Sequence, residues 1–197
     1  MQGPNSPKDP ERRRWLTATA VAGGAGLIAT SVPFVASMAP SERARALGAP
    51  VELSLNDIAP GELRSVAWRG KPVFVLRRSP EMLDALTRHD DLLADPHSLR
   101  SEQPAFARNT GRSVKPEFSV MVGLCTHLGC IPTFRPVPGA ADLGASWPGG
   151  FFCPCHGSKF DLSGRVFKSV PAPTNLEVPV YHFAGDNRLV IGVDPVG

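Results

Sequence analysis

Short runs of apolar residues fill the second part of the chain and predict a mainly β structure. Turn signals at residues 59–61 and 69–71 separate the first three runs, which are expected to open an antiparallel sheet. Pro80 and residues 81–89 predict one helix, and Asp90–Lys115 is expected to form a polar loop. The expected strands are Val51–Leu55, Leu63–Trp68, Pro72–Arg77, Phe118–Gly123, Phe151–Phe152, Arg165–Phe167, Leu176–Val180 and Leu189–Val193.

The N-terminal part has a different pattern, because residues 16–38 carry no charge. As a helix these 23 residues would reach about 35 Å, enough to cross a hydrocarbon layer about 30 Å thick. A single transmembrane anchor over residues 16–38 is therefore expected. A removable signal peptide is the alternative, but Pro40 directly follows the weak cleavage pattern Ser37-Met38-Ala39 and favours retention of the span.

The charges on either side of this span predict its orientation. Lys8 and Arg12–Arg14 precede it, against Arg43 and Arg45 after it, so the positive-inside rule places residues 1–15 in the cytoplasm. The run from Arg12 to Leu16 is also similar to a twin-arginine export signal, although Glu11 stands where that signal has Ser or Thr. An ordinary positively flanked anchor explains the same residues, and both interpretations stay open.

Residues 39–50 differ again, because they combine small residues, prolines and a few charges. This stretch, APSERARALGAP, is typical of a linker that carries little core of its own. It predicts a flexible hinge between the anchor and a domain over residues 51–197.

Composition limits the class of protein. Among 197 residues, 42% are hydrophobic and 20% are charged, which argues against a disordered chain and against a polytopic membrane protein. The 19 glycines and 21 prolines favour short strands and structured loops over helices. The net charge of +3 is spread along the chain, so the charge pattern gives no case for nucleic-acid binding.

All four cysteines lie in two short loops, and each loop supplies one histidine. The loops are CTHLGC, residues 125–130, and CPCHGS, residues 153–158. A disulfide scaffold would explain an even number of cysteines, but not the histidine in each loop. A zinc site is a stronger alternative, since two Cys and two His make a tetrahedral ligand set, but it leaves two cysteines without a role.

Together these loops make the chain similar to a known family. CTHLGC and CPCHGS, supported by the N-terminal span, the linker and residues 170–173 (VPAP), resemble the Rieske iron–sulfur subunits of bacterial ubiquinol–cytochrome c reductases, the cytochrome bc1 complexes. The resemblance covers nearly the whole chain. It implies an antiparallel Rieske-type β-sandwich with a small cluster-binding subdomain at about residues 120–175, preceded by one transmembrane helix.

The resemblance also implies one 2Fe–2S cluster. Two neutral imidazoles in place of two thiolates make such a cluster less negative, which raises its potential and makes quinol a feasible electron donor. The outward ring nitrogens can also titrate, so a ligand histidine can take up a proton. The implied metal ligands are Cys125 and Cys153 on one iron and His127 and His156 on the other, with a disulfide between Cys130 and Cys155.

Two kinds of neighbouring residue match family positions that tune the cluster. Ser158 matches a serine whose hydroxyl bonds a bridging sulfide, and Phe160 stands where many relatives have a tyrosine that donates a hydrogen bond to the sulfur equivalent to Cys125. Gly129 and Gly157 allow a positive φ, and amides in such tight loops can also point at sulfides.

Other residues are expected at contacts with partners or in the framework. The family uses the position of Leu128 to dock against cytochrome b, and Pro171 and Pro173 resemble a proline loop that covers the cluster. The remaining histidines, His89, His97 and His182, have no cysteine nearby and are interpreted as surface or structural residues.

The function implied by the resemblance is electron transfer from ubiquinol, bound in cytochrome b, through the 2Fe–2S cluster to cytochrome c1. His156 would hydrogen-bond the quinol, and catalysis would belong to a dimeric respiratory complex of the bacterial inner membrane. The soluble domain would lie on the periplasmic side, where a disulfide persists. A Rieske ferredoxin and the Rieske small subunit of a periplasmic oxidase are the alternatives. The anchor and the second cysteine pair disfavour the ferredoxin, and the proline stretch and linker disfavour the oxidase subunit.

Overall fold

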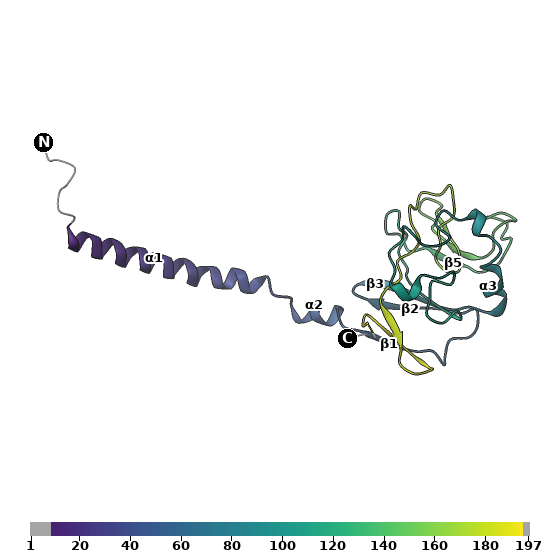
Figure 1. Cartoon of the computed structure of the whole chain (residues 1–197), viewed down its shortest axis with the longest axis horizontal. Helices are drawn as coiled ribbons and strands as arrows, with labels where there is room; N and C mark the ends of the chain where they lie inside the picture. Colours follow the sequence, from purple (N-terminus) through teal and green to yellow (C-terminus); the bar gives the residue numbers. More distant parts are fainter. Residues whose placement is uncertain (1–8, 195–197) are drawn as a thin grey trace. The chain divides into compact units, whose positions relative to one another are not determined.

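The computed structural model describes residues 9–194 of the chain. The chain divides into two compact units, residues 1–46 and residues 47–197. Within the described residues, the first unit contains the long helix α1 and the second contains all the strands (Figure 1).

Helix α1, Pro10–Ser37, has the length and composition of a membrane span. It begins where Asp9 caps the helix, because the carboxylate accepts from the amide of Glu11 at 3.0 Å and Pro10 occupies the first helical position. Its threonine and serine hydroxyls donate to carbonyls three or four residues earlier, as Thr17 does to Arg13 at 2.9 Å. Such internal bonding satisfies the polar groups of a helix in hydrocarbon.

Part of the expected hinge is helical. Helix α2 runs over Glu42–Leu47, and the Ser41 hydroxyl accepts from the amide of Ala44 at 3.2 Å. A serine directly before a run of good helix formers is a normal helix start. The linker composition therefore indicated a connecting segment, but not its local helix.

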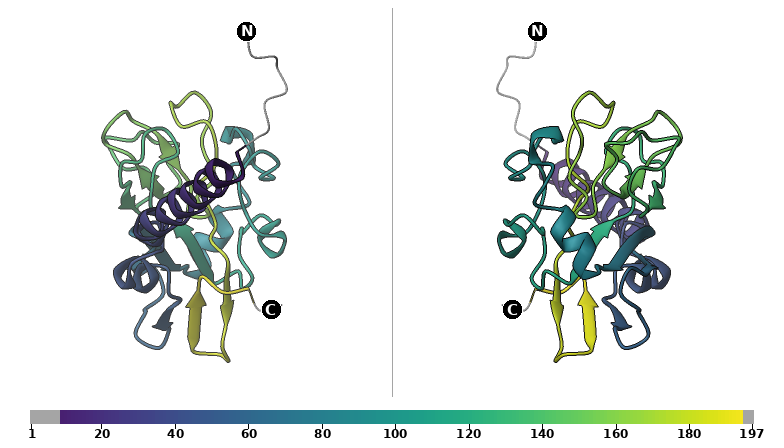
Figure 2. Two further views of the ribbon diagram at one scale, coloured as in Figure 1. Left: turned by 90° about the vertical axis from the view of Figure 1, so that its left-hand side faces the viewer. Right: turned by 90° about the vertical axis from the view of Figure 1, so that its right-hand side faces the viewer.

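Nine strands within the described residues form three antiparallel sheets of three strands each. Figure 2 shows the β5–β7 sheet and the β8–β9 hairpin at opposite ends of the domain. The first sheet has the order β1 (Val51–Ser54), β9 (Arg188–Ile191), β8 (Tyr181–Phe183). The central sheet is β2 (Leu63–Trp68), β3 (Lys71–Arg77), β4 (Phe118–Val122), and the third is β5 (Thr133–Arg135), β6 (Gly150–Phe152), β7 (Lys159–Phe160).

Strand β3 separates two hydrophobic cores, because successive side chains of a strand point to opposite faces. Val73 and Val75 belong to the inter-sheet core, which lies between the central sheet and the β1-β9-β8 sheet. Phe74 and Leu76 belong to the ligand-loop core, which also contains Cys125, Cys153 and residues of the third sheet. All four of these β3 side chains are buried. A sheet buried on both faces explains why this strand is a continuous apolar run.

Several sequence predictions of secondary structure were right and some were wrong. The early strands and the strands at residues 118, 151 and 189 are confirmed, while helix α3 is shorter than expected and spans Pro80–Ala85. The expected polar loop contains two short 3-10 helices, η1 (Asp90–Leu92) and η2 (Ala105–Ala107). Arg165–Phe167 makes only isolated bridges, and Leu176–Val180 is not a strand.

The error at Leu176–Val180 has a clear cause. The amides of Leu176 and Val178 donate to irregular segments, to Gly164 at 2.8 Å and to Glu102 at 3.3 Å. The Glu177 carbonyl accepts one bond from Val122 of β4 at 2.8 Å, which is too little to make a ladder. Pro179 has no amide hydrogen to continue a ladder. Strands β5, β7 and β8 were not predicted, since each has only two or three residues and so offers little alternation to detect.

Candidate metal centre

The two Cys/His loops occupy equivalent places in the fold. The first ligand loop, residues 125–130, lies between β4 and β5, and the second ligand loop, residues 153–158, lies between β6 and β7. Both therefore leave a strand at the edge of the ligand-loop core, where Cys125 and Cys153 are buried at 3% and 2% exposure.

The backbones of the two loops make the same hydrogen bonds. The Cys125 amide donates to the carbonyl of Cys130 and the Cys153 amide to that of Ser158, both at 2.8 Å. Inside each loop, the amides of Gly129 and Gly157 donate to Cys125 and Cys153, both at 2.9 Å. Each loop is thus a closed turn whose first residue presents a thiol.

Both glycines have a φ of 79°, in the left-handed region that favours glycine. A Cβ at Gly129 or Gly157 would meet nothing within 4 Å, so the turn conformation and not crowding calls for glycine. The amides of both glycines donate to loop carbonyls, so these bonds support their role in turn formation. That amides of these loops also stabilise a cluster stays a prediction.

Cys125 and Cys153 are the two cysteines outside the disulfide. Burial raises the pKa of the Cys125 thiol, and the neighbouring Cys153 raises it further, while hydrogen bonds from the His127 amide and the Ser158 hydroxyl lower it. Two thiols this close disfavour ionisation of both, because the second thiolate would repel the first. A metal between them would remove that repulsion, since metals bind the thiolate form.

The two histidines of the loops lie beside each other and are more open to solvent than the thiols. The ring centroids of His127 and His156 are 4.8 Å apart at an interplanar angle of 90°. His127 is half-buried, and His156 is exposed. Two imidazoles at the surface and two thiols beneath them thus converge from the two loops.

A disulfide joins Cys130 and Cys155, as the resemblance implied, across a Cα–Cα distance of 6.7 Å. The sulfurs of Cys130, Cys153 and Cys155 all lie within 4.8 Å of one another. Two of these three are joined to each other, so only Cys153 keeps a thiol that can bind a metal. The bridge therefore links the two ligand loops without using a ligand.

The donor set fits a Rieske 2Fe–2S cluster. Such a cluster takes two thiolates on one iron and two imidazoles on the other, and Cys125, Cys153, His127 and His156 supply that set at one place. The thiols are free, buried and adjacent, and each histidine comes from the same loop as a thiol. The disulfide accounts for the two cysteines that a zinc site would have left over.

The proline stretch is tied to both ligand loops. The Ser158 hydroxyl, which also faces the Cys125 thiol, accepts from the amide of Ala172 at 3.0 Å. Thr126 in the first loop donates to the carbonyl of Thr174 at 2.7 Å. Ala172 is buried in the ligand-loop core, while Pro171 and Pro173 are exposed on either side of it.

Two further expected residues have contrasting environments. Phe160 is fully buried in the ligand-loop core with both thiols and pairs with Phe151 in the third sheet. Leu128 is 71% exposed at the tip of the first loop, beside His127. An apolar side chain this exposed in a fixed loop is available for contact with a partner.

Sequence reasoning missed a buried polar network behind the ligand loops. Arg165, Asp161 and His89 are all buried; Arg165 Nε lies 2.7 Å and His89 Nε2 3.2 Å from an oxygen of Asp161. Arg78 and Arg112 are buried as well. The structural interpretation of His89 is confirmed, but the arginines gave no signal, because single arginines in polar segments normally face solvent.

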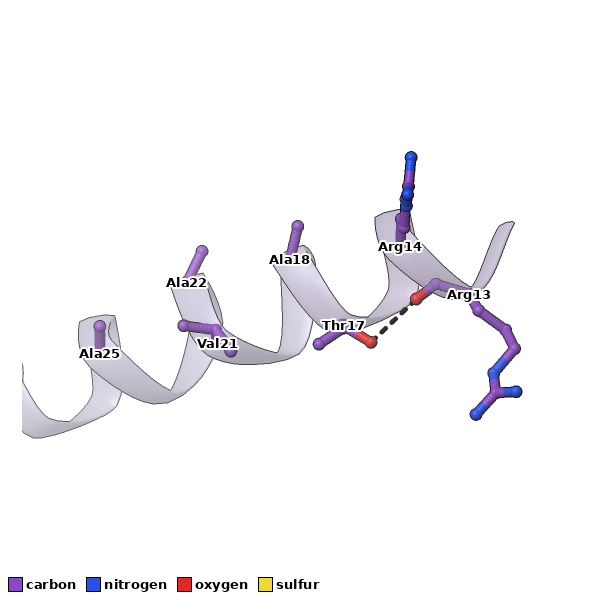
Figure 3. Close-up of a pocket in the computed structure, with 7 residues that line it drawn as sticks. All are labelled: Arg13, Arg14, Thr17, Ala18, Val21, Ala22 and Ala25. Atoms are coloured by element: carbon purple, nitrogen blue, oxygen red, sulfur yellow. Dashed lines mark hydrogen bonds between the residues drawn. The ribbon is translucent and has the colours of Figure 1, made fainter. Parts of the chain in front are cut away.

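A hollow along α1 is lined by residues of that helix and does not include the Cys/His loops. It is one open side of a single helix, where Thr17 bonds back to Arg13 (Figure 3). No thiol, imidazole or carboxylate lines it, so it offers no second metal centre within the described residues. Its lining residues are Arg13, Arg14, Thr17, Ala18, Val21, Ala22 and Ala25.

Comparison with known proteins shows the family of the chain. A family model described as the Rieske [2Fe-2S] domain matches residues 50–182. The ubiquinol-cytochrome c reductase iron-sulfur subunit of Allochromatium vinosum is 56% identical over 183 residues, which cover 93% of this chain and 88% of that protein. The mitochondrial Rieske subunit of the cytochrome b-c1 complex of Solanum tuberosum is 44% identical, over 94% of this chain and 64% of that protein. A solved chain from a hyperthermophilic respiratory Complex III covers 88% of this chain and 97% of that chain at 26% identity, with a TM-score of 0.49.

Proposed function

Because this chain belongs to the Rieske [2Fe-2S] family, we propose that it is the electron-transfer subunit of a ubiquinol–cytochrome c reductase. In this role it takes electrons from ubiquinol at cytochrome b and passes them toward cytochrome c1 within a dimeric respiratory complex. The observation that carries the proposal is the convergence of two buried free thiols with two imidazoles from paired loops. The strong similarity to the Allochromatium vinosum subunit supports the same assembly.

The ligands in this proposal are Cys125, Cys153, His127 and His156. When bound, a 2Fe–2S cluster with two imidazole ligands supplies one-electron chemistry at a potential well above that of an all-cysteine cluster. The chain's own contribution is the environment. The buried thiols are kept from water, and the disulfide and the two loop turns hold the four donors together.

His156 is the residue that meets the quinol in this proposal. Its ring is exposed while the thiol of its loop is buried, so its outward nitrogen can accept a hydrogen bond from a quinol hydroxyl and hold the proton that is released. The exposed Leu128 lies beside the other imidazole and would pack against the apolar wall of the quinol site. Water would then be excluded from the contact that moves the proton.

The N-terminal unit has the properties needed to keep this subunit at a membrane. We propose residues 16–38 as a retained anchor, residues 1–15 as its cytoplasmic flank and residues 51–197 as a periplasmic domain. Mass spectrometry of protein extracted from membranes should find peptides from Arg12 to Met38 still attached. A mature chain that begins at Pro40 would contradict the anchor, and protection of the domain from protease added to the periplasm would contradict its location.

Residues 39–50 are proposed as the hinge that lets the domain reach two partners. One fixed position cannot bring the same donor set to a quinol on one protein and a haem on another. Several prolines within Ala44–Gly48 would break α2 and stiffen the connection. Slower quinol oxidation with an unchanged cluster spectrum is expected, whereas unchanged turnover would contradict a mobile domain.

Purification of the tagged full chain from its own membranes tests the main proposal. We expect b-type and c-type haem to copurify in fixed proportion, an iron content of two per chain, and quinol-dependent reduction of cytochrome c. A His156→Ala variant should lose that activity, with the Lys168→Ala variant, altered at an exposed position of the same subdomain, as the matched control. A molybdenum partner in place of haem would identify a periplasmic oxidase and contradict the proposal.

A further inference from the structure

A turn that is wholly buried lies directly behind the second ligand loop. Residues 160–166 are all buried, although the turn Asp161–Arg165 has no regular secondary structure and Gly164 in it has a φ of 72°. Turns normally lie at the surface, because buried backbone amides and carbonyls need partners that water would otherwise supply. The partners of this turn are therefore expected to be specific.

The amides of the turn are satisfied within it, since those of Ser163 and Arg165 both donate to the Asp161 carboxylate at 2.8 Å. Two arginines from outside the turn supply partners for its acceptors. Arg78 donates to the Ser163 hydroxyl at 2.7 Å, and the other end of its guanidinium reaches Ser113 at 2.8 Å. Arg112 donates to the carbonyls of Ser163 and Gly164 at 3.2 and 3.4 Å. Bonds from a charged donor to buried acceptors are stronger than neutral ones, and a lost donor leaves its acceptor unsatisfied.

Both arginines are fixed to the sheet that carries the first ligand loop. Arg78 directly follows β3, and its amide donates to the carbonyl of Glu117, next to the start of β4, at 2.7 Å. Arg112 precedes β4 in a loop that Asn109 closes through Ser113 at 2.9 Å. Strand β4 then leads straight into the first ligand loop.

The turn itself is continuous with the second ligand loop. Only the two residues of β7 separate Ser158 from Asp161, and β7 pairs with β6, which leads into Cys153. The turn also fixes the segment after the proline stretch, because the Leu176 amide donates to the Gly164 carbonyl at 2.8 Å. Arg112 completes that junction with a bond to the Leu176 carbonyl at 2.7 Å.

We propose that Arg78 and Arg112 are positioning residues, which set the orientation of the second ligand loop relative to the first. This inference rests on the proposed function, since it assigns the two loops to one cluster. The disulfide joins Cys130, at the end of the first loop, to Cys155 within the second, and the arginines tie the turn that follows β7 to the segments beside β3 and β4. Two separated tethers fix an angle between two bodies, which one tether alone does not.

The chemistry of the two side chains makes the test possible. Burial lowers the pKa of both guanidinium groups to about 10, so both stay charged at neutral pH. Lysine keeps the charge but loses the planar fork of donors, whereas methionine loses both. The lysine variants therefore remove the geometry of the guanidinium donors and keep the charge, and the methionine variants remove both.

The experiment uses the full chain in its membrane complex, with Arg78→Lys, Arg78→Met, Arg112→Lys and Arg112→Met. Arg77→Met is the matched control, because Arg77 is the neighbouring arginine and bonds Ile58 and Glu117 away from the turn. The readouts are the electron paramagnetic resonance spectrum and the midpoint potential of the fraction that retains iron, with the rate of cluster loss. A purely structural role would lower the retained fraction without changing its spectrum.

We expect altered g-values in both the Lys and the Met variants, a rate of cluster loss about tenfold higher, and wild-type behaviour in Arg77→Met. A wild-type spectrum in the retained fraction of the Lys and Met variants would overturn the proposal. A spectrum that changes in the Met variants but not in the Lys variants would also overturn the proposal. The charge of the side chain, and not the geometry of its donors, would then be responsible. Should the four variants fail to accumulate, Ser163→Ala, which removes only one acceptor of Arg78, decides the matter by the same spectrum.

The experiment can contradict the proposed function and the proposed role of the arginines independently of each other. Wild-type protein without a Rieske-type spectrum or without haem partners would contradict the proposed function itself. A normal wild-type spectrum with unaltered variants would contradict only the role of the arginines.

Discussion

The two cores on either face of the central sheet are held together in different ways. The inter-sheet core lies between strands of up to seven residues, and it consists of aliphatic and aromatic side chains such as Val75, Leu189 and Tyr181. The ligand-loop core lies between the opposite face of the central sheet and strands of two or three residues, and it contains two thiols. Most residues of the first core lie in strands, whose backbone groups are paired in ladders, whereas most residues of the second lie outside strands.

The difference shows what a metal site requires of its surroundings. Ladders fix a strand along its length, so burial of apolar side chains is sufficient for the inter-sheet core. Loops have no ladder, and the ligand-loop core depends on individual tethers. These are the Cys130–Cys155 disulfide, the Thr126–Thr174 and Ser158–Ala172 hydrogen bonds and the arginine-held turn. A change to a tether should therefore act on the metal centre, and a change to the inter-sheet core should act on the whole domain.

The largest effect is expected from Asp161, the fully buried anion of the turn. Removing one partner of a buried ion pair costs about 3–5 kcal/mol, because the remaining charge is left without compensation. Asp161→Asn should lower the free energy of unfolding by that amount at neutral pH through the loss of its pairing with Arg165 at 2.7 Å. Chemical denaturation of the two proteins measures it, and a change below about 1 kcal/mol would mean that the turn does not depend on this charge.

The same carboxylate predicts a pH dependence. Burial alone would raise the pKa of Asp161, but the hydrogen bond from His89 and the charge of Arg165 outweigh it and hold the pKa below its ordinary value. The folded protein therefore binds this proton less readily than the unfolded chain, whose aspartate pKa is about 3.9. The stabilisation is present above about pH 4 and is lost as the pH falls through the folded pKa. Asp161→Asn should flatten this acid limb, and equal acid slopes in the two proteins would contradict the assignment.

Two buried leucines compare the cores directly. Leu76 and Leu189 are both 0% exposed, but Leu76 faces the ligand-loop core and Leu189 the inter-sheet core. Substitution of either by alanine should cost about 2–5 kcal/mol of unfolding free energy, from lost burial and a residual cavity. Only Leu76→Ala should also lower the iron content of the protein that remains folded. Equal iron loss in both variants would show that the two cores are not independent.

The disulfide between Cys130 and Cys155 is a tether that the family resemblance implied and that the structure contains. Replacing both Cys130 and Cys155 by serine should cost about 2–5 kcal/mol, shorten the lifetime of the cluster and lower its potential. Amide hydrogen exchange should accelerate in the two ligand loops while the β1-β9-β8 sheet keeps its protection. If cluster lifetime and potential stay at wild-type values in the double variant, the bridge has no role at the metal centre.

The smallest predicted effect concerns Phe160, which is buried with both thiols. Phe160→Tyr places a hydroxyl in the ligand-loop core, where it can donate a hydrogen bond to the Cys125 sulfur. If that bond strengthens when the cluster is reduced, the midpoint potential should rise by some tens of millivolts. About 1.4 kcal/mol corresponds to roughly 59 mV for one electron. Phe118→Tyr in the inter-sheet core is the control and should leave the potential unchanged. Protein-film voltammetry measures both, and an unchanged or lowered potential in folded Phe160→Tyr would mean that Phe160 serves packing alone.

The parts of the fold that sequence predicted are those with a local signal. The continuous apolar run of β3 and the helix start at Pro80 were recognised because period and turn residues lie within a few positions of each other. The donor residues were recognised for the same reason, since each ligand loop is six residues long and contains its own Cys and His. Resemblance to the family then paired Cys130 with Cys155, as the structure does.

Residue types at short spacing are enough to identify the side chains that can bind a metal and the stretch that can cross a membrane. Tertiary packing buries Arg78 and Arg112 and brings both to Ser163, which lies 85 positions after Arg78 and 51 after Arg112. The same packing leaves the amides of Leu176 and Val178 bonded to irregular segments, while the Glu177 carbonyl accepts a single bond from Val122 of β4. Such contacts have no local pattern, because the partners of a buried donor are set by which distant segments the packing of two cores brings together.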